Sequence, residues 1–187
     1  MQLLSWVQVG FAGTVAGVIG LGALSNSVPA QEPVRLADSK ATGINSKATK
    51  IDVAQIRKIL DEMQVAAKKQ DTEALVKYLA PDVEIDMTIQ SLVGTQTLRL
   101  NREQYRQYLE QGFGITQDYS GKYSNLNVQV AANGKTASAT YTLVEEVVMK
   151  DSAIAITSST NSLIQFELIQ GQILATQLKS TSKVDLK

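Results

Sequence analysis

The sequence predicts an α+β domain in which a group of helices precedes a curved antiparallel sheet. Two observations support this prediction. Early in the folded part, apolar residues recur every three or four positions from Val53 to Ala67, which is the period of a helix face. Beyond about residue 120, alternating apolar and polar residues are separated by turn sequences, of which Asn133-Gly134 is the strongest hairpin indicator.

The first helix is expected to begin after Asp52, a good N-cap residue, and to carry its apolar face through Ala67. A second, shorter helix follows Asp71 and is expected to end at Pro81, because proline cannot continue a helix. The apolar side of this second helix consists of Leu75, Val76 and Leu79.

A third helix is expected after Asn101, with Gln104 at the position that completes a capping box. Its apolar face holds Tyr105, Tyr108 and Leu109. Tyrosines at this spacing usually belong to the core, although a buried ring with a bonded hydroxyl can also line a pocket.

Between the second and third helices, apolar residues from Val83 to Ile89 alternate with Glu84 and Asp86, which predicts a strand with one buried face. The segment from Thr97 to Leu100 is its expected partner. Paired carboxylates can perform acid–base chemistry or hold a hard cation. Because Glu84 and Asp86 alternate with apolar residues, they are expected on the solvated face instead.

The Asn133-Gly134 turn fixes a register for the first long hairpin, pairing Val130 with Ala137, Val128 with Ala139, and Leu126 with Tyr141. Continued along the strand, this register places Lys122 opposite Glu145. A cross-strand ion pair would then explain both charged residues without any ligand.

A turn at Asp151-Ser152 extends the sheet and pairs Val147 with Ile156 and Ala137 with Phe166. A last turn near Gly171 returns the final strand. The apolar faces coincide in both hairpins, which supports the two registers.

Composition excludes several classes of function. The 187 residues include 18 Lys and Arg and 18 Asp and Glu, so no basic footprint indicates a nucleic-acid partner. There is no Cys and no His, which removes thiolate chemistry and the commonest general base and metal ligand. No metal site and no cofactor are expected, and chemistry would have to come from Asp, Glu, Tyr, Lys or the backbone.

The N-terminal segment predicts export. Residues 1–31 carry no charged side chain, and residues 3–24 are mostly apolar or small. Val28 and Ala30 form a small-x-small pattern typical of signal-peptide cleavage, although the basic start of a signal peptide is missing. Residues 1–30 are therefore interpreted as a cleaved signal peptide of a periplasmic or secreted protein. The alternative is a membrane anchor, because residues 3–24 are long enough to span a bilayer.

Residues 31–50 are polar and are expected to form a flexible linker before a domain at 51–187. That domain resembles the NTF2-like superfamily, also called SnoaL-like. The resemblance is carried by the segment from Lys69 to Val83, by the helix start from Asn101 to Tyr105, and by Gln170 to Ile173. It implies a cone in which N-terminal helices close over a curved antiparallel sheet. Members include isomerases, hydratases and pure binding proteins, often as dimers.

The predicted hairpins place a polar group in the middle of an otherwise apolar sheet face. Glu145 lies there beside Tyr141, and the facing strand contributes three hydroxyls. Mostly apolar surroundings with a few convergent polar groups are typical of a ligand pocket. The candidate ligand-binding residues are Tyr105, Tyr108, Tyr141, Glu145, Ser158, Thr160 and Ser162. The alternative is that residues 158–162 form an irregular, solvated stretch, because this serine-rich sequence is a poor strand.

The leading hypothesis is an exported NTF2-like module that binds a small apolar ligand or a protein partner and is not an enzyme. It rests on the resemblance and on the absence of His and of a catalytic motif of the family. The second hypothesis is an isomerase or hydratase that uses Glu145 as acid–base and Tyr141 as hydrogen-bond donor. The third is a homodimer formed through the open sheet face.

Overall fold

The computed structural model describes residues 48–150 and 154–186. These residues form three helices and six strands, and the strands form one sheet in the order β2-β1-β6-β5-β4-β3. The elements are α1 (Val53–Lys68), α2 (Thr72–Val76), β1 (Leu79–Ser91), β2 (Gly94–Leu100), α3 (Arg102–Gly114), β3 (Thr116–Val130), β4 (Thr136–Met149), β5 (Ala155–Ile169) and β6 (Gln172–Leu186).

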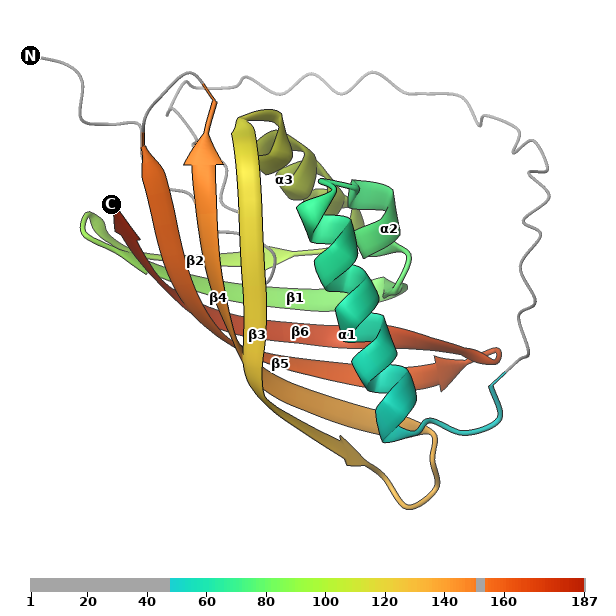
Figure 1. The fold of residues 1–187 in the computed structure, drawn as a ribbon. Helices are drawn as coiled ribbons and strands as arrows, with labels where there is room; N and C mark the ends of the chain where they lie inside the picture. The colour runs from blue at the N-terminus through green and yellow to red at the C-terminus, as the bar shows by residue number, and fades with distance from the viewer. Residues whose placement is uncertain (1–47, 151–153, 187) are drawn as a thin grey trace, which may run out of the picture.

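The sheet is strongly curved, and the helices lie together on one side of it (Figure 1). This arrangement confirms the predicted α+β cone. Four of the five strand pairings are antiparallel, whereas β1 and β6 pair in parallel. This parallel pair places the first strand beside the last, and β2 and β3 remain at the two edges of the sheet. The sheet is therefore mostly antiparallel, with this one parallel junction.

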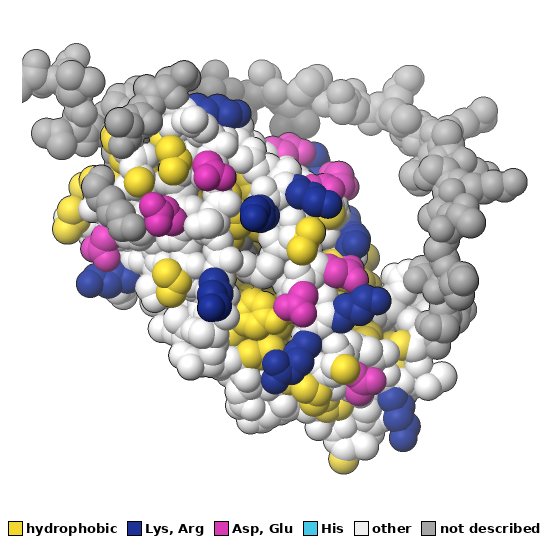
Figure 2. All heavy atoms as spheres, in the orientation of Figure 1, with side chains coloured by type: hydrophobic (Ala, Val, Ile, Leu, Met, Phe, Trp, Pro, Cys, Tyr) yellow, Lys and Arg dark blue, Asp and Glu magenta, His cyan; other side chains and the backbone are white. Residues whose placement is uncertain are grey.

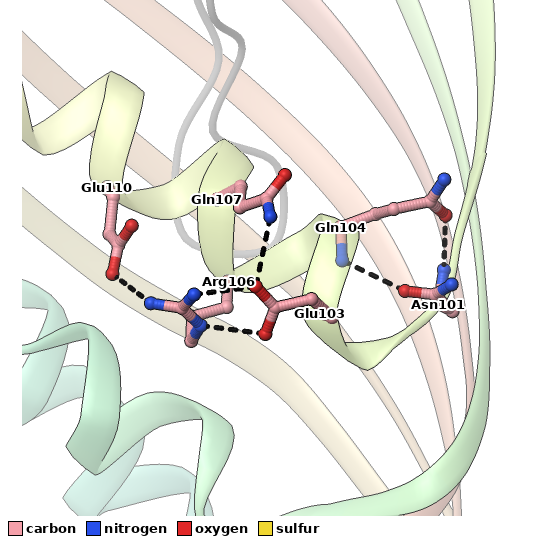
Figure 3. A network of polar contacts seen from close by, with 6 residues as sticks. All are labelled: Asn101, Glu103, Gln104, Arg106, Gln107 and Glu110. Atoms are coloured by element: carbon pink, nitrogen blue, oxygen red, sulfur yellow. Dashed lines mark hydrogen bonds and ion pairs between the residues drawn. The ribbon is translucent and has the colours of Figure 1, made fainter. Parts of the chain in front are cut away.

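The capping chemistry explains where α1 and α3 begin. Asp52 accepts a hydrogen bond from the Gln55 backbone nitrogen, and the Gln55 side chain accepts one from Asp52 in return. Asn101 and Gln104 form the same reciprocal pair at the start of α3 (Figure 3). Each box satisfies two backbone N–H groups that a helix start leaves without partners.

On the solvated side of α3, Arg106 bridges Glu103 and Glu110 at 2.6 and 2.5 Å (Figure 3). The opposite side of the helix carries Tyr105 and Leu109, which are buried against the sheet. Because the charged and apolar residues occupy different sides of α3, its tyrosines point toward the interior.

The second helix is shorter than the sequence indicated. It ends at Val76, and β1 already begins at Leu79, so Pro81 lies inside the strand. Proline is tolerated there because the pairing of β1 with β6 is interrupted between Leu79 and Glu84. The alternation from Val83 to Ile89 is confirmed, with Glu84 and Asp86 on the solvated face and Asp86 3.4 Å from Arg99.

The predicted register of β4 with β5 is confirmed, including the pairs Val147 with Ile156 and Glu145 with Ser158. The Asp151-Ser152 turn that predicted it lies outside the described residues. The stretch Ser158–Ser162 is part of β5, so the prediction of an irregular, solvated segment was wrong. This stretch pairs with β4 on one side and β6 on the other, and these pairings hold it in a strand although its serine-rich composition does not favour one.

The core lies between the helices and the inner face of the sheet. Helix α1 packs mainly against β3 and α3 mainly against β1, so the helices meet the sheet at its flanks. The central strands contribute fully buried side chains such as Leu143, Ile164 and Phe166. Each of these contributes about 1.5–3 kcal/mol relative to an exposed position.

On the face shown in Figure 2, basic and acidic side chains are interspersed, which agrees with the balanced composition. The residues just before α1 pack at the edge of the core. Ala48 donates a backbone hydrogen bond to Gly171, and Ile51 is buried. In residues 48–150 and 154–186, no helix is long and apolar enough to cross a membrane. The predicted signal peptide or anchor lies outside the described residues.

Candidate functional site

A bulge in β3 decides which side chain meets Glu145. The predicted pairs Val130 with Ala137 and Val128 with Ala139 are present. Between Ser124 and Asn127, however, β3 carries one residue more than β4, and Asn125 has a φ of 55°. An extra residue moves every side chain beyond it to the other face of the strand.

The shift places Gly121, not Lys122, opposite Glu145, and Lys122 pairs with Val144 on the outer side. Lys122 is exposed. The predicted pairing of Leu126 with Tyr141 and the predicted ion pair between Lys122 and Glu145 were therefore both wrong. The bulge turns the lysine outward and brings Tyr119 inward in its place.

Glu145 lies on the inner face of β4 with 1% of its surface exposed. Tyr119 donates its hydroxyl to one carboxyl oxygen at 2.8 Å, and Ser158 donates to the other at 3.1 Å. These donors come from β3 and β5, the two strands that flank β4. Among the described residues, no Lys or Arg forms an ion pair with this carboxyl.

Burial without a counter-ion raises the pKa of Glu145 well above its ordinary value of 4.5. The hydrogen bonds from Tyr119 and Ser158 favour the charged form and oppose this shift without overcoming it. Glu145 therefore remains protonated at pH values at which an exposed glutamate is charged. A buried carboxyl of this kind is typical of functional sites.

Four tyrosines surround the carboxyl. Burial raises the pKa of Tyr105, Tyr108 and Tyr119 above the ordinary tyrosine value, and the proximity of Glu145 adds to each shift. For Tyr141, burial raises the pKa to about 12. The rings of Tyr105 and Tyr108 stack with their centroids 6.3 Å apart. All four hydroxyls therefore stay protonated near neutral pH and can both donate and accept hydrogen bonds.

A row of hydroxyls continues from Ser158 along β5 and onto β6. Thr160 is fully buried and lies 2.8 Å from the Ser182 hydroxyl. Ser162 is opposite Tyr141 in the register. The buried hydroxyl of Tyr108 makes no hydrogen bond to any of the described residues. Such groups are uncommon in native interiors and indicate where a ligand or a water would be accommodated.

The structure thus brings the predicted residues Glu145 and Ser158 into direct contact. The predicted residues Tyr105 and Tyr108 lie on α3, close enough to Glu145 for its charge to affect their pKa values. Tyr141 is on the same inner face but makes no hydrogen bond to Glu145, and Thr160 and Ser162 extend the polar row away from the carboxyl.

Tyr119 and Gly121 belong to this site and were missed. A Cβ atom built on Gly121 would lie 2.4 Å from the Tyr119 hydroxyl and 3.2 Å from Gln64 Oε1. Only the absence of a side chain at position 121 lets the tyrosine ring pass over the strand and reach Glu145. A Tyr-x-Gly sequence opposite a buried glutamate was the available indication, but its use requires knowledge of the bulge.

Glu145 lines none of three surface hollows formed by the described residues. The first, of about 590 Å³, opens on the outer sheet face around Thr142 and Asn161, and the predicted ligand-binding residues Tyr141 and Ser162 contribute to its lining. The second is beside α1 and α2, and the third is at the β3–β4 end of the sheet. Within the described ranges, no group of three or more Asp or Glu side chains is placed to hold a metal ion.

Comparison with known proteins identifies the architecture. No protein-family model matches the sequence, and no curated protein matches it either. Solved structures do. One is an NTF2-like protein of unknown function from Pseudomonas putida KT2440, with a TM-score of 0.53, 17% identity, and coverage of 68% of this chain and 84% of that one. The chain has the NTF2-like fold.

Two further NTF2-like matches carry names of enzymes. A protein provisionally named a scytalone dehydratase, from Novosphingobium aromaticivorans DSM 12444, matches with a TM-score of 0.58 and 14% identity over 70% of this chain and 83% of its own. A hexachlorocyclohexane dehydrochlorinase, LinA type 2, matches with a TM-score of 0.57 and 12% identity over 72% and 87%. At these identities the likeness establishes the fold alone.

Replacing Tyr119 by phenylalanine tests which tyrosine donates to Glu145. Tyr119→Phe removes a donor from a buried carboxyl oxygen and should lower the free energy of unfolding by about 1–3 kcal/mol. It should also raise the pKa of Glu145 further. Tyr141→Phe, the matched control, should leave that pKa nearly unchanged. Urea unfolding and NMR titration measure both effects, and a larger pKa change in Tyr141→Phe would contradict the assignment.

The raised pKa of Glu145 makes stability depend on pH. The folded state holds this proton more tightly than the unfolded state, so the resulting stability is complete below pH 4.5 and is lost as pH rises through the folded pKa. As pH rises through this range, the free energy of unfolding of the wild type should fall relative to that of Glu145→Gln. The fall should be about 1.4 kcal/mol for each unit by which folding raises the pKa of Glu145. Urea unfolding between pH 4 and about pH 9 checks this sign. Glu146→Gln, an exposed neighbour, should show no such trend, and a constant wild-type-to-Glu145→Gln difference would refute the expectation.

Proposed function

We propose that this NTF2-like domain binds a small, largely apolar molecule inside the cone and recognises one polar group of that molecule through Glu145. The observation that carries the proposal is the buried carboxyl without a counter-ion, held by Tyr119 and Ser158. A purely structural core gains nothing from such a group, because burying an unpaired charge or holding its proton costs stability. The buried core also holds apolar side chains, including Leu143 and Leu109, which would contact the body of a ligand that enters it.

A ligand would reach Glu145 most directly past Tyr119. Gly121 is exposed, and a Cβ atom built on it would lie 2.4 Å from the Tyr119 hydroxyl and 3.2 Å from Gln64 Oε1 of α1, so this hydroxyl lies close to the surface. Tyr119 itself is 2% exposed, so it separates the carboxyl from the surface. Binding through this route requires the Tyr119 ring to move.

The proposal is tested with a panel of small molecules by thermal unfolding, in the wild type, Glu145→Gln and Glu146→Gln. A ligand should raise the Tm of the wild type and of Glu146→Gln, and raise that of Glu145→Gln much less. In NMR spectra the same ligand should shift the amides of Tyr119, Glu145 and Ser158. Shifts confined to Thr142 and Asn161, on the outer face, would contradict a site inside the cone.

A second candidate function is acid–base catalysis, and the Tyr119–Glu145 hydrogen bond favours it. A protonated carboxyl with a raised pKa can donate a proton, and in its ionised form it can remove one. Two structures with this fold are named as a dehydratase and a dehydrochlorinase. Tyr119 would then take the donor role that the sequence suggested for Tyr141. Turnover of a bound ligand that is lost in Glu145→Gln would favour catalysis over binding.

We further propose that the domain acts outside the cytoplasm, on the basis of the uncharged, apolar segment at residues 3–24. Mass spectrometry of the protein from its native cells distinguishes a chain beginning after Ala30 from an uncleaved, membrane-anchored one. The homodimer through the open sheet face also stays a prediction, and light scattering at high concentration tests it.

A further inference from the structure

The interior polar groups share one property: apart from Glu145, all are uncharged. Tyr105, Tyr119 and Tyr141 supply phenols, and the remaining buried polar residues carry aliphatic hydroxyls. Those residues are Thr116, Ser158, Thr160, Ser162, Ser180 and Ser182. The inner face therefore offers one carboxyl, many hydroxyl oxygens and several aromatic rings, and no described Lys or Arg is buried with them.

We propose that the polar group recognised in the cone is an organic cation, namely the ammonium end of a small amine. This inference rests on the proposed binding function and specifies its ligand class. An ammonium group would supply the counter-ion that the bulge in β3 withholds by turning Lys122 outward. A carboxylate ligand would meet the opposite situation, because none of the described Lys or Arg side chains is buried there to receive it.

The hydrogen bonds at Glu145 suit the ionised carboxyl. Tyr119 and Ser158 each donate to a different oxygen, and each oxygen keeps a further lone pair for a third donor. An ammonium N–H can use these lone pairs without displacing either protein donor. A neutral ligand with an acceptor group would instead bind the protonated carboxyl and would gain no charge–charge attraction.

The hydroxyl and ring groups around the carboxyl provide the rest of an ammonium site. The buried Tyr108 hydroxyl forms no hydrogen bond with the described part of the chain and can accept an N–H bond. The stacked Tyr105 and Tyr108 rings and the edge-on pair of Tyr123 and Tyr141 add aromatic surface, to which cations are attracted.

Binding of a cation exchanges a proton. In the unliganded domain Glu145 holds its proton, whereas the ammonium complex needs the carboxylate, so one proton leaves as the cation enters. The titratable groups that face Glu145 are Tyr105 and Tyr108 from α3, Tyr119 from β3 and Tyr141 from β4. Since all four stay neutral near pH 7, the pH dependence belongs to Glu145. Ammonium affinity should rise about tenfold per pH unit below the folded pKa of Glu145 and level off above it.

The test measures binding of linear alkylammonium ions with four to eight carbons by calorimetry, on the full chain. Alcohols and carboxylates of the same chain length are the matched probes. At least one ammonium should bind about tenfold or more tightly than its alcohol, a difference of about 1.4 kcal/mol. Glu145→Gln should lose that preference and the pH dependence, and Glu146→Gln should keep both.

The outcomes separate the two proposals. If alcohols or carboxylates bind as tightly as the ammonium ions and still depend on Glu145, the cation inference fails and the binding function stands. If no member of the three series binds, the cation inference is overturned, and the broader panel of small molecules described above then decides the binding function independently.

Discussion

Truncating Leu143 to alanine should lower the free energy of unfolding by about 2–5 kcal/mol, the range for a fully buried leucine. Leu143 has 0% exposure and lies on the inner face of β4 between Tyr141 and Glu145. Its neighbours across the strands are Tyr123 and Thr160. The loss combines the transfer free energy of the removed atoms with the cavity that a packed interior cannot fully close.

The adjacent residue is the control for this prediction. Val144 lies on the same strand but points outward and is 53% exposed, so Val144→Ala should cost no more than about 1 kcal/mol. Urea unfolding of both variants measures the contrast. Equal losses, or a larger loss for Val144→Ala, would show that the inner and outer faces of β4 are assigned the wrong way round.

Placing a methyl group on Gly121 should be the most disruptive small change at the candidate site. The new Cβ would lie 2.4 Å from the Tyr119 hydroxyl and 3.0 Å from its ring carbon, so the ring must shift. We expect Gly121→Ala to cost about 1–3 kcal/mol, as for overpacking elsewhere. It should also break the hydrogen bond to Glu145 and thereby raise the pKa of that carboxyl further.

Two comparisons isolate the cause. A Cβ on Gly114, at the end of α3, meets no atom within 4 Å, so Gly114→Ala should be neutral or stabilise by up to about 1 kcal/mol. In a Tyr119→Phe background the closest clashing atom is gone, and Gly121→Ala should cost less than it does in the wild type. An equal cost in both backgrounds would mean that the Tyr119 hydroxyl is not what Gly121 accommodates.

The parts of the fold that could be predicted from the sequence depend on local chemistry. The capping boxes at Asp52 and Asn101 are encoded within four residues, and both helices begin there. The Asn133-Gly134 sequence predicted the nearby register, in which Val130 faces Ala137; in this turn Gly134 has a positive φ of 65° and donates its backbone N–H to Ala131. Apolar alternation then extends the prediction along β4 and β5 as far as Glu145 and Ser158.

The parts that could not be predicted depend on long-range pairing or on a single unmarked residue. The parallel contact of β1 with β6 joins residues about a hundred positions apart, for which no local pattern exists. The bulge occurs at Asn125, a residue type that tolerates a positive φ but does not require one. That one residue decided whether a lysine or a tyrosine meets Glu145, and so whether the carboxyl is an ion-pair partner or an uncompensated acid.

The account depends on Glu145 being a buried carboxyl that keeps its proton, and NMR titration of its side-chain carboxyl carbon tests this most directly. In the unliganded wild type, one glutamate resonance should titrate well above pH 4.5, and it should be absent from Glu145→Gln and present in Glu146→Gln. A Glu145 resonance that titrates at or below pH 4.5 would contradict the account, because a buried carboxyl with no ion-pair partner among the described residues should ionise only at higher pH.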